Sequence, residues 1–192
     1  MASILQAPSS SEYSLWTCRW TAPALTLRSC QAGQMPRRRD PATCDDRGVI
    51  WLLRHGEAEG SADDDASRRL TATGGSQSRA AGAALAALGV QLDACLTSPK
   101  LRALDTARIA CEVLGLDPEP TAALRGGDFV PAELVAGRGE VVLVGHEPDL
   151  SRAIQVATGA RVALKKGGLA AIDESTLMAL LRPDHLRGIA GS

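Results

Sequence analysis

Short apolar runs alternate with longer amphipathic stretches from residue 48 onwards. Short apolar runs bounded by turn signals predict strands, which we expect at 49–53, 94–97, 118–121, 141–144, 168–173 and 176–181. Apolar residues recur at helical spacing in the stretches between them, which predicts helices at 75–88, 101–114, 131–136 and 150–157, with a polar loop at 63–69. Strands that alternate with helices indicate an α/β sandwich with a largely parallel sheet.

The first part of the chain, residues 1–47, lacks this alternation. It contains clusters of Ser, Thr, Pro and Arg, and the run Pro36–Pro41 suits neither a helix nor a strand. We therefore predict a disordered N-terminal extension at 1–47 and a folded domain at 48–192. Two other interpretations stay open: the Ser- and Arg-rich start weakly resembles a transit peptide, or translation starts at Met35.

The composition narrows the class of protein. The formal net charge is −1, which argues against a protein that binds nucleic acid through a strongly basic face. We expect no membrane association, because no apolar run is long enough to span a bilayer. The five cysteines are odd in number and irregularly spaced, which argues against a disulfide framework or a zinc site. A reducing compartment, and hence a cytoplasmic location, is therefore expected; the oligomeric state stays open.

Three segments with chemically active side chains each follow an apolar run. They contain Arg54 and His55 after the first run, Ser98 and Arg102 after the second, and His146 after the fourth. In sheets of this kind, ligands bind beyond the carboxyl ends of the strands. If these strands are parallel neighbours, their ends bring the side chains to one rim. Arg102 then lies in the first turn of a helix, whose free N–H groups also favour an anion.

These residue types suit phosphoryl transfer. The guanidinium groups of Arg54 and Arg102 can hold phosphate oxygens in a fixed orientation. His55 can act as the nucleophile and form a phosphohistidine that water then hydrolyses. A protonated His146 would add a donor and would disfavour protonation of His55. We expect Ser98 to cap the following helix, and its hydroxyl is also a candidate contact for phosphate. This chemistry implies no metal and no cofactor.

The active segments belong to an ordered series of motifs. These are R-H-G at 54–56, L-T-x-x-G at 70–74, S-P-x-x-R-A-x-x-T-A at 98–107, V-G-H-x-P at 144–148, and the segment Lys165–Ala170. In this series the chain resembles the histidine phosphatase superfamily, and within it the short SixA-like phosphohistidine phosphatases, over roughly residues 48–182. The resemblance implies a three-layer α/β/α sandwich of the phosphoglycerate mutase-like fold. It also implies that His55 is the nucleophile and that Arg54, Arg102 and His146 form a phosphate pocket.

The chain departs from the family at the proton donor. Many members carry a donor carboxylate between the second arginine and the second histidine, but residues 124–129 lack the familiar glutamate context. Asp128 is a possible donor. The cluster Asp63–Asp65 is another, although a solvated loop is the main interpretation of that cluster. Short SixA-like proteins also lack an obvious donor, which suits a P–N substrate because an imidazole leaving group needs less assistance than an alkoxide.

We therefore expect a phosphatase that removes phosphate from a phosphohistidine-bearing protein through a covalent phosphohistidine intermediate. One alternative is a broad-specificity phosphomonoesterase that acts on small phosphoesters with the same fold. Another is a non-catalytic phosphate-binding module, which the presence of both histidines and both arginines disfavours. The loop after His55 is short, which predicts an open site. Lys165 and Lys166 are either a solvated pair or a contact for an acidic substrate.

Overall fold

The computed structural model describes residues 48–60 and 64–191; the predicted extension at 1–47 and Asp63 lie outside the described residues. The strands are β1 (Ile50–Arg54), β2 (Ala94–Thr97), β3 (Pro118–Pro120), β4 (Val141–Gly145), β5 (Leu169–Asp173) and β6 (Thr176–Leu181). The α-helices are α1 (Ala72–Ala87), α2 (Leu101–Leu114), α3 (Pro131–Leu134), α4 (Asp149–Thr158) and α5 (Pro183–Ile189). Two short 3-10 helices are η1 (Asp65–Ser67) and η2 (Ala122–Leu124).

The six strands form one sheet in the order β3-β2-β4-β1-β5-β6. β1, β2, β3 and β4 are parallel to one another, which confirms the prediction for the strands that precede the active segments. β5 and β6 are antiparallel to their neighbours. The two-residue turn between β5 and β6 explains why these two strands are antiparallel to each other, because a parallel pair needs a long crossover connection.

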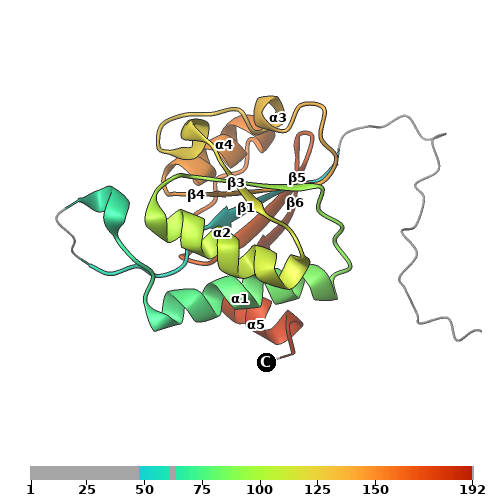
Figure 1. Cartoon of the computed structure of the whole chain (residues 1–192). Coiled ribbons are helices and arrows are strands. Elements are labelled where there is room, and N and C mark those ends of the chain that lie inside the picture. Colours follow the sequence, from blue (N-terminus) through green and yellow to red (C-terminus); the bar gives the residue numbers. More distant parts are fainter. Residues whose placement is uncertain (1–47, 61–63, 192) are drawn as a thin grey trace, which may run out of the picture. The chain divides into compact units, whose positions relative to one another are not determined.

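The sheet is covered by helices on both faces (Figure 1). Successive residues of a strand point to opposite faces. Trp51 and Leu53 of β1 accordingly pack with α1, α2 and α5, whereas Ile50 and Leu52 pack with η2 and α4. The two hydrophobic clusters are built mainly from Ala, Leu and Val, as the scarcity of aromatic residues requires. The expected three-layer sandwich is therefore present.

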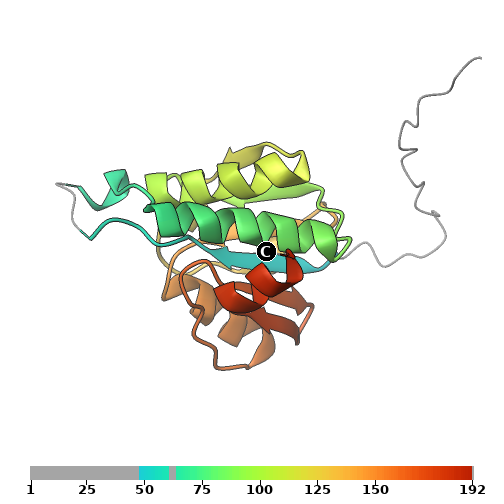
Figure 2. The same ribbon diagram turned by 90° about the horizontal axis from the view of Figure 1, so that it is seen from below.

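Helices α1 and α2 lie side by side against the sheet (Figure 2). At their contact a Cβ atom added to Gly82 would lie 2.5 Å from the carbonyl oxygen of Ala110. A side chain at this position would therefore push the two helices apart. Gly75, on the same helix, has more space, because an added Cβ atom would lie 3.9 Å from the nearest atom, Cδ1 of Ile109.

The structure differs from the sequence-based expectations in several places, among them the unpredicted η2 and the end of α3 at Leu134 rather than at residue 136. α1 begins at Ala72 rather than at residue 75, because the Thr71 side chain caps it by accepting the N–H of Gly74 at 3.1 Å. α5 was not predicted, although Pro183 stands in its first turn, where proline is favoured. The polar loop at 63–69 contains η1. In the described part of the chain, no helix has the length and hydropathy needed to cross a membrane.

Candidate functional site

The carboxyl ends of β1, β2 and β4 meet at one edge of the sheet. The register of β1 and β4 pairs Arg54 with Gly145. One residue beyond β1, the His55 N–H donates to the Gly145 carbonyl at 3.1 Å. The Ser98 N–H likewise donates to the Val144 carbonyl at 3.0 Å. The residues that follow the three strands therefore stand next to one another, as the sequence predicted.

The His55 side chain is held in one orientation by its own neighbour. Its Nδ1 lies 2.7 Å from the Gly56 carbonyl oxygen, which can only accept, so neutral His55 carries its proton on Nδ1. The lone pair is left on Nε2. The Nε of Arg102 donates to this atom at 3.3 Å. The nitrogen with nucleophilic character thus already faces one of the two predicted phosphate-binding arginines.

His146 lies beside His55, with the ring centroids 5.1 Å apart. Its Nε2 is 2.8 Å from the Ser98 hydroxyl, which also accepts the Lys100 N–H at 3.3 Å. A hydroxyl oxygen can accept two hydrogen bonds and donate one, so this contact is compatible with either neutral tautomer of His146. Lys100, not Ser98, is the N-cap residue of α2. The expected cap at Ser98 is thus corrected to a contact with Lys100 and His146.

Both imidazoles are neutral at neutral pH. Desolvation by burial, assisted by the charges of Arg102, Arg54 and Lys166, lowers the pKa of His55 to about 4, although the hydrogen bond to Gly56 opposes this effect. Burial, together with the neighbouring His55 and Arg102, lowers the pKa of His146 to about 3. His55 is consequently available as a nucleophile. His146 lacks the positive charge considered in the sequence analysis as long as no anion is bound.

Arg54, the last residue of β1, is half-buried at the same edge. One terminal nitrogen, Nη1, donates to the Leu164 carbonyl at 2.6 Å. Desolvation lowers the pKa of its guanidinium, and the charge of Glu147 partly offsets that effect. Across the described residues, two buried side-chain nitrogens have no hydrogen-bond partner, Arg54 Nε and His146 Nδ1. Both belong to the predicted phosphate pocket, where anion oxygens would satisfy them.

Arg102 is bound to Asp65, a contact that the sequence analysis missed. Its Nη1 donates to the Asp65 main-chain carbonyl at 2.6 Å, and its Nη2 lies 3.2 Å from the Asp65 carboxylate. Lys100 reaches the same carboxylate at 3.0 Å. Hydrogen bonds from Lys100 and Arg102 hold the pKa of Asp65 well below its usual range. Asp65 is therefore an ionised partner of the arginine, a state that does not suit a proton donor.

The other predicted donor, Asp128, lies on the surface. Its carboxylate is exposed and forms an ion pair with Arg152 at 3.4 Å. The described hydrogen bonds and ion pairs do not join Asp128 to His55 or to Arg102. The structure therefore brings together Arg54, His55, Ser98, Arg102 and His146, hereafter the candidate site, and leaves Asp128 outside this set.

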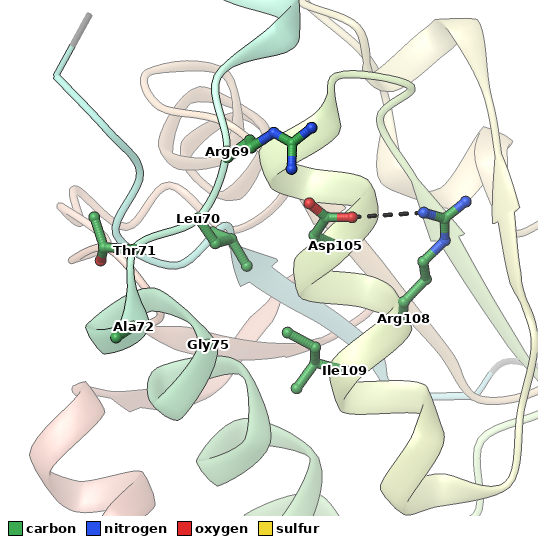
Figure 3. Close-up of a pocket in the computed structure, with 8 residues that line it drawn as sticks. All are labelled: Arg69, Leu70, Thr71, Ala72, Gly75, Asp105, Arg108 and Ile109. Carbon is green, nitrogen blue, oxygen red and sulfur yellow. Dashed lines mark ion pairs between the residues drawn. The ribbon is translucent and has the colours of Figure 1, made fainter.

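Two cavities of the described structure have more than one arginine in their walls. One, of about 440 Å³, lies between the segment Arg69–Ala72 and α2 and contains the ion pair of Asp105 with Arg108 (Figure 3). The other, of about 650 Å³, includes Arg54 in its wall. Among the described residues there is no group of three His, Cys, Asp or Glu side chains arranged to hold a metal ion.

The arrangement suits attack on a phosphorus atom. The Arg102 guanidinium contacts Nε2 of His55, and the His146 ring lies beside it, so an anion held by these groups would present its phosphorus to that lone pair. Donors fixed before the reaction stabilise the charge that spreads over the phosphoryl oxygens in the transition state.

Comparisons with known proteins bear on the family and the fold of the chain. A family model described as the histidine phosphatase superfamily (branch 1) matches residues 50–136. An uncharacterised protein of Picosynechococcus sp. is 34% identical over 134 residues, which cover 62% of this chain and 81% of that protein.

Solved structures share the fold. The protein histidine phosphatase SixA complexed with tungstate has a TM-score of 0.64 and 25% identity, over 72% of this chain and 99% of that one. A candidate phosphohistidine phosphatase SixA from Agrobacterium tumefaciens has a TM-score of 0.62 and 21% identity, over 71% and 98% of the two chains. A candidate α-ribazole-5′-P phosphatase from Escherichia coli has a TM-score of 0.60 and 20% identity, over 71% of this chain and 98% of that one. The expected phosphoglycerate mutase-like fold is confirmed.

Proposed function

The chain belongs to the histidine phosphatase superfamily, and from this premise we propose that it is a phosphatase that removes phosphate from phosphohistidine carried by a protein. The observation that carries the proposal is the state of His55. Its Nδ1 is committed to the Gly56 carbonyl, its Nε2 lone pair faces Arg102, and burial keeps it neutral. A neutral, oriented imidazole is what nucleophilic attack on a phosphoryl group requires.

The reaction proceeds in two steps. The lone pair of His55 Nε2 forms a bond to phosphorus, while the P–N bond of the substrate breaks and its electron pair returns to the substrate imidazole. Water then attacks the phosphoryl group on His55, the new P–N bond breaks, and phosphate leaves as one proton is released. Arg54, Arg102 and His146 hold the phosphoryl oxygens throughout by donating hydrogen bonds.

The pairing of both candidate donors with cations favours a P–N substrate over an alkyl phosphate. An alkoxide leaving group needs a proton at the moment of cleavage, and a group that supplies it has to lie within hydrogen-bonding reach. Asp128 is exposed and paired with Arg152, and Asp65 is ionised and paired with Arg102. An imidazole whose other nitrogen is protonated leaves as a neutral molecule and does not depend on either residue.

The test compares a phosphohistidine peptide, p-nitrophenyl phosphate and glycerol phosphate as substrates. We expect the phosphohistidine peptide to have the highest kcat/KM, and His55→Ala to lower it more than about 10³-fold. His185→Ala, which removes an exposed histidine of α5, is the matched control and should retain wild-type activity. Rapid quenching at alkaline pH should trap one phosphoryl group on His55, detected by mass spectrometry.

Two results would contradict the proposal. Phosphate release by the His55→Ala variant at the wild-type rate would remove the nucleophile. A much higher kcat/KM for glycerol phosphate than for the peptide would favour the phosphomonoesterase alternative.

A further inference from the structure

The second cavity is strongly basic. Its wall contains five cationic side chains and a single carboxylate, Asp184, which is paired with Arg187; the cations are Arg54, Lys165, Lys166, Arg182 and Arg187. The whole chain has a formal net charge of −1, so this concentration of positive charge is local and does not reflect the composition. Such a cavity attracts anionic groups.

The cavity is joined to the candidate site through Arg54. The Arg54 side chain donates to the Leu164 carbonyl, directly before the two lysines, at 2.6 Å. The Gly167 N–H, directly after them, lies 3.0 Å from the His55 carbonyl oxygen. The lysine pair is therefore fixed at both ends to the end of β1. Lys166 is close enough for its charge to contribute to the lowered pKa of His55.

The form of the cavity indicates what binds there. Lys165, Lys166 and Arg182 are exposed, and they come from two separate segments, the connection after α4 and the start of α5. A single small anion is held by buried, converging donors, whereas exposed flexible cations spread over a wide cavity suit several carboxylates along a peptide. The cavity of Figure 3 is less suitable, because one of its two arginines, Arg108, is already paired with Asp105.

We propose that this basic cavity binds acidic residues that flank the phosphohistidine of the protein substrate. The inference rests on the proposed function, because it concerns where the residues next to the phosphohistidine of the same substrate bind. In this arrangement the phosphoryl group lies at His55, and adjoining carboxylates extend past Arg54 towards Lys165 and Arg182. The cavity thereby selects among phosphohistidine-bearing proteins by the charge around the modified residue.

The experiment uses the full chain and two phosphohistidine peptides that differ only in their flanks, Glu in one and Gln in the other. We expect wild-type kcat/KM to be about tenfold higher for the Glu peptide at low salt, mainly through KM, and the preference to decline as salt screens the charges. The double variant Lys165→Gln/Arg182→Gln should bring the ratio of the two values close to one. Because it is a ratio, a general loss of activity cancels.

A matched control removes the same charge elsewhere. Arg79 and Arg161 are exposed and do not line the cavity, so Arg79→Gln/Arg161→Gln should retain the wild-type ratio. Equal rates for the two peptides with the wild type, or an equal loss of preference in the control, would overturn the acidic-flank inference and leave the proposed function intact. Failure to hydrolyse either peptide would overturn both.

Discussion

His55 owes its chemical state to its surroundings. The same imidazole on an exposed loop would titrate near 6.5, but burial beside Arg102 and Arg54 lowers its pKa to about 4. The neutral form is therefore held by the fold and not by the pH of the medium. At His146, the negative charge of an incoming phosphoryl group opposes the effect of burial and favours the protonated imidazole. The positive charge that His146 lacks in the free protein is therefore favoured by the substrate itself.

The lowered pKa values predict the pH dependence of activity. We expect kcat/KM for p-nitrophenyl phosphate, corrected for ionisation of the substrate, to fall only as the pH decreases through about 4, not through 6.5. An NMR titration of the His55 imidazole checks the assignment, with the urea-unfolded chain as the reference. An enzyme pKa near 6.5 in the corrected profile would mean that His55 is far more solvated than its burial implies.

The same values affect stability in a definite direction. The folded protein binds fewer protons than the unfolded chain at pH values between the folded and unfolded pKa of each histidine. The contribution of His55 and His146 to the free energy of unfolding is thus fully present above pH 6.5 and is lost as the pH falls through about 4 and about 3.

At the scale of the element, η1 brings a negative charge onto Arg102, an arginine of the proposed phosphate pocket. The Asp65 carboxylate forms ion pairs with both Arg102 and Lys100. An incoming phosphate therefore competes with this carboxylate for the same cations. We predict that Asp65→Asn binds inorganic phosphate roughly two- to tenfold more tightly, measured by calorimetry. Asp64→Asn is the control, because it removes the same charge from the same segment, and asparagine also caps a helix.

The opposite result for Asp65→Asn would also be informative. Weaker phosphate binding than in the control would show that the ion pair chiefly orients Arg102 for the ligand. Its role would then be positioning and not competition.

Helix α1 offers a pair of glycines with opposite expected effects. Gly75→Ala should raise the free energy of unfolding by about 0.5–1 kcal/mol, because alanine favours a helix and the added methyl group has space. Gly82→Ala should lower it by about 1–3 kcal/mol, because its Cβ would collide with the Ala110 carbonyl. Urea denaturation measures both variants. Equal stabilisation by the two substitutions would mean that α1 and α2 can separate at little cost.

Most elements could be predicted because their hydrophobic pattern is local. The apolar run at 141–144, for example, predicted β4. Arg102, His55 and His146 each follow an apolar run, and this placement predicted that they would meet at one edge of the sheet. The contact of Asp65 with Arg102 could not be predicted in this way. From sequence alone, an acidic residue in a polar loop is expected to be exposed to solvent. The contact arises only in the folded chain, where η1 lies against the start of α2. For α5, the sequence contains a signal for a helix start at Pro183. The apolar periodicity after it was too short to predict a helix.

At the scale of the whole molecule, the described residues that form the two hydrophobic clusters run from Val49 to Ile189. Because the composition of residues 1–47 indicates a disordered extension, we predict that their deletion changes Tm by less than about 2 °C and leaves phosphatase activity unchanged. Deletion of residues 1–54 is the contrasting variant, because it removes β1 from the centre of the sheet and should abolish cooperative unfolding. A clearly lower Tm for the shorter deletion would show that the N-terminal segment contributes to the fold.

The two edges of the sheet differ in their capacity to accept another strand. β3 forms one edge, and of its three residues only Glu119 has a backbone N–H, because proline has none. β6 forms the other edge, and Thr176–Leu181 contains no proline. An unprotected edge strand is a template for pairing between chains. If two copies associate edge to edge, during refolding or at high concentration, we therefore expect them to pair through β6. The two prolines of β3 remove the backbone N–H groups that pairing at the other edge would need.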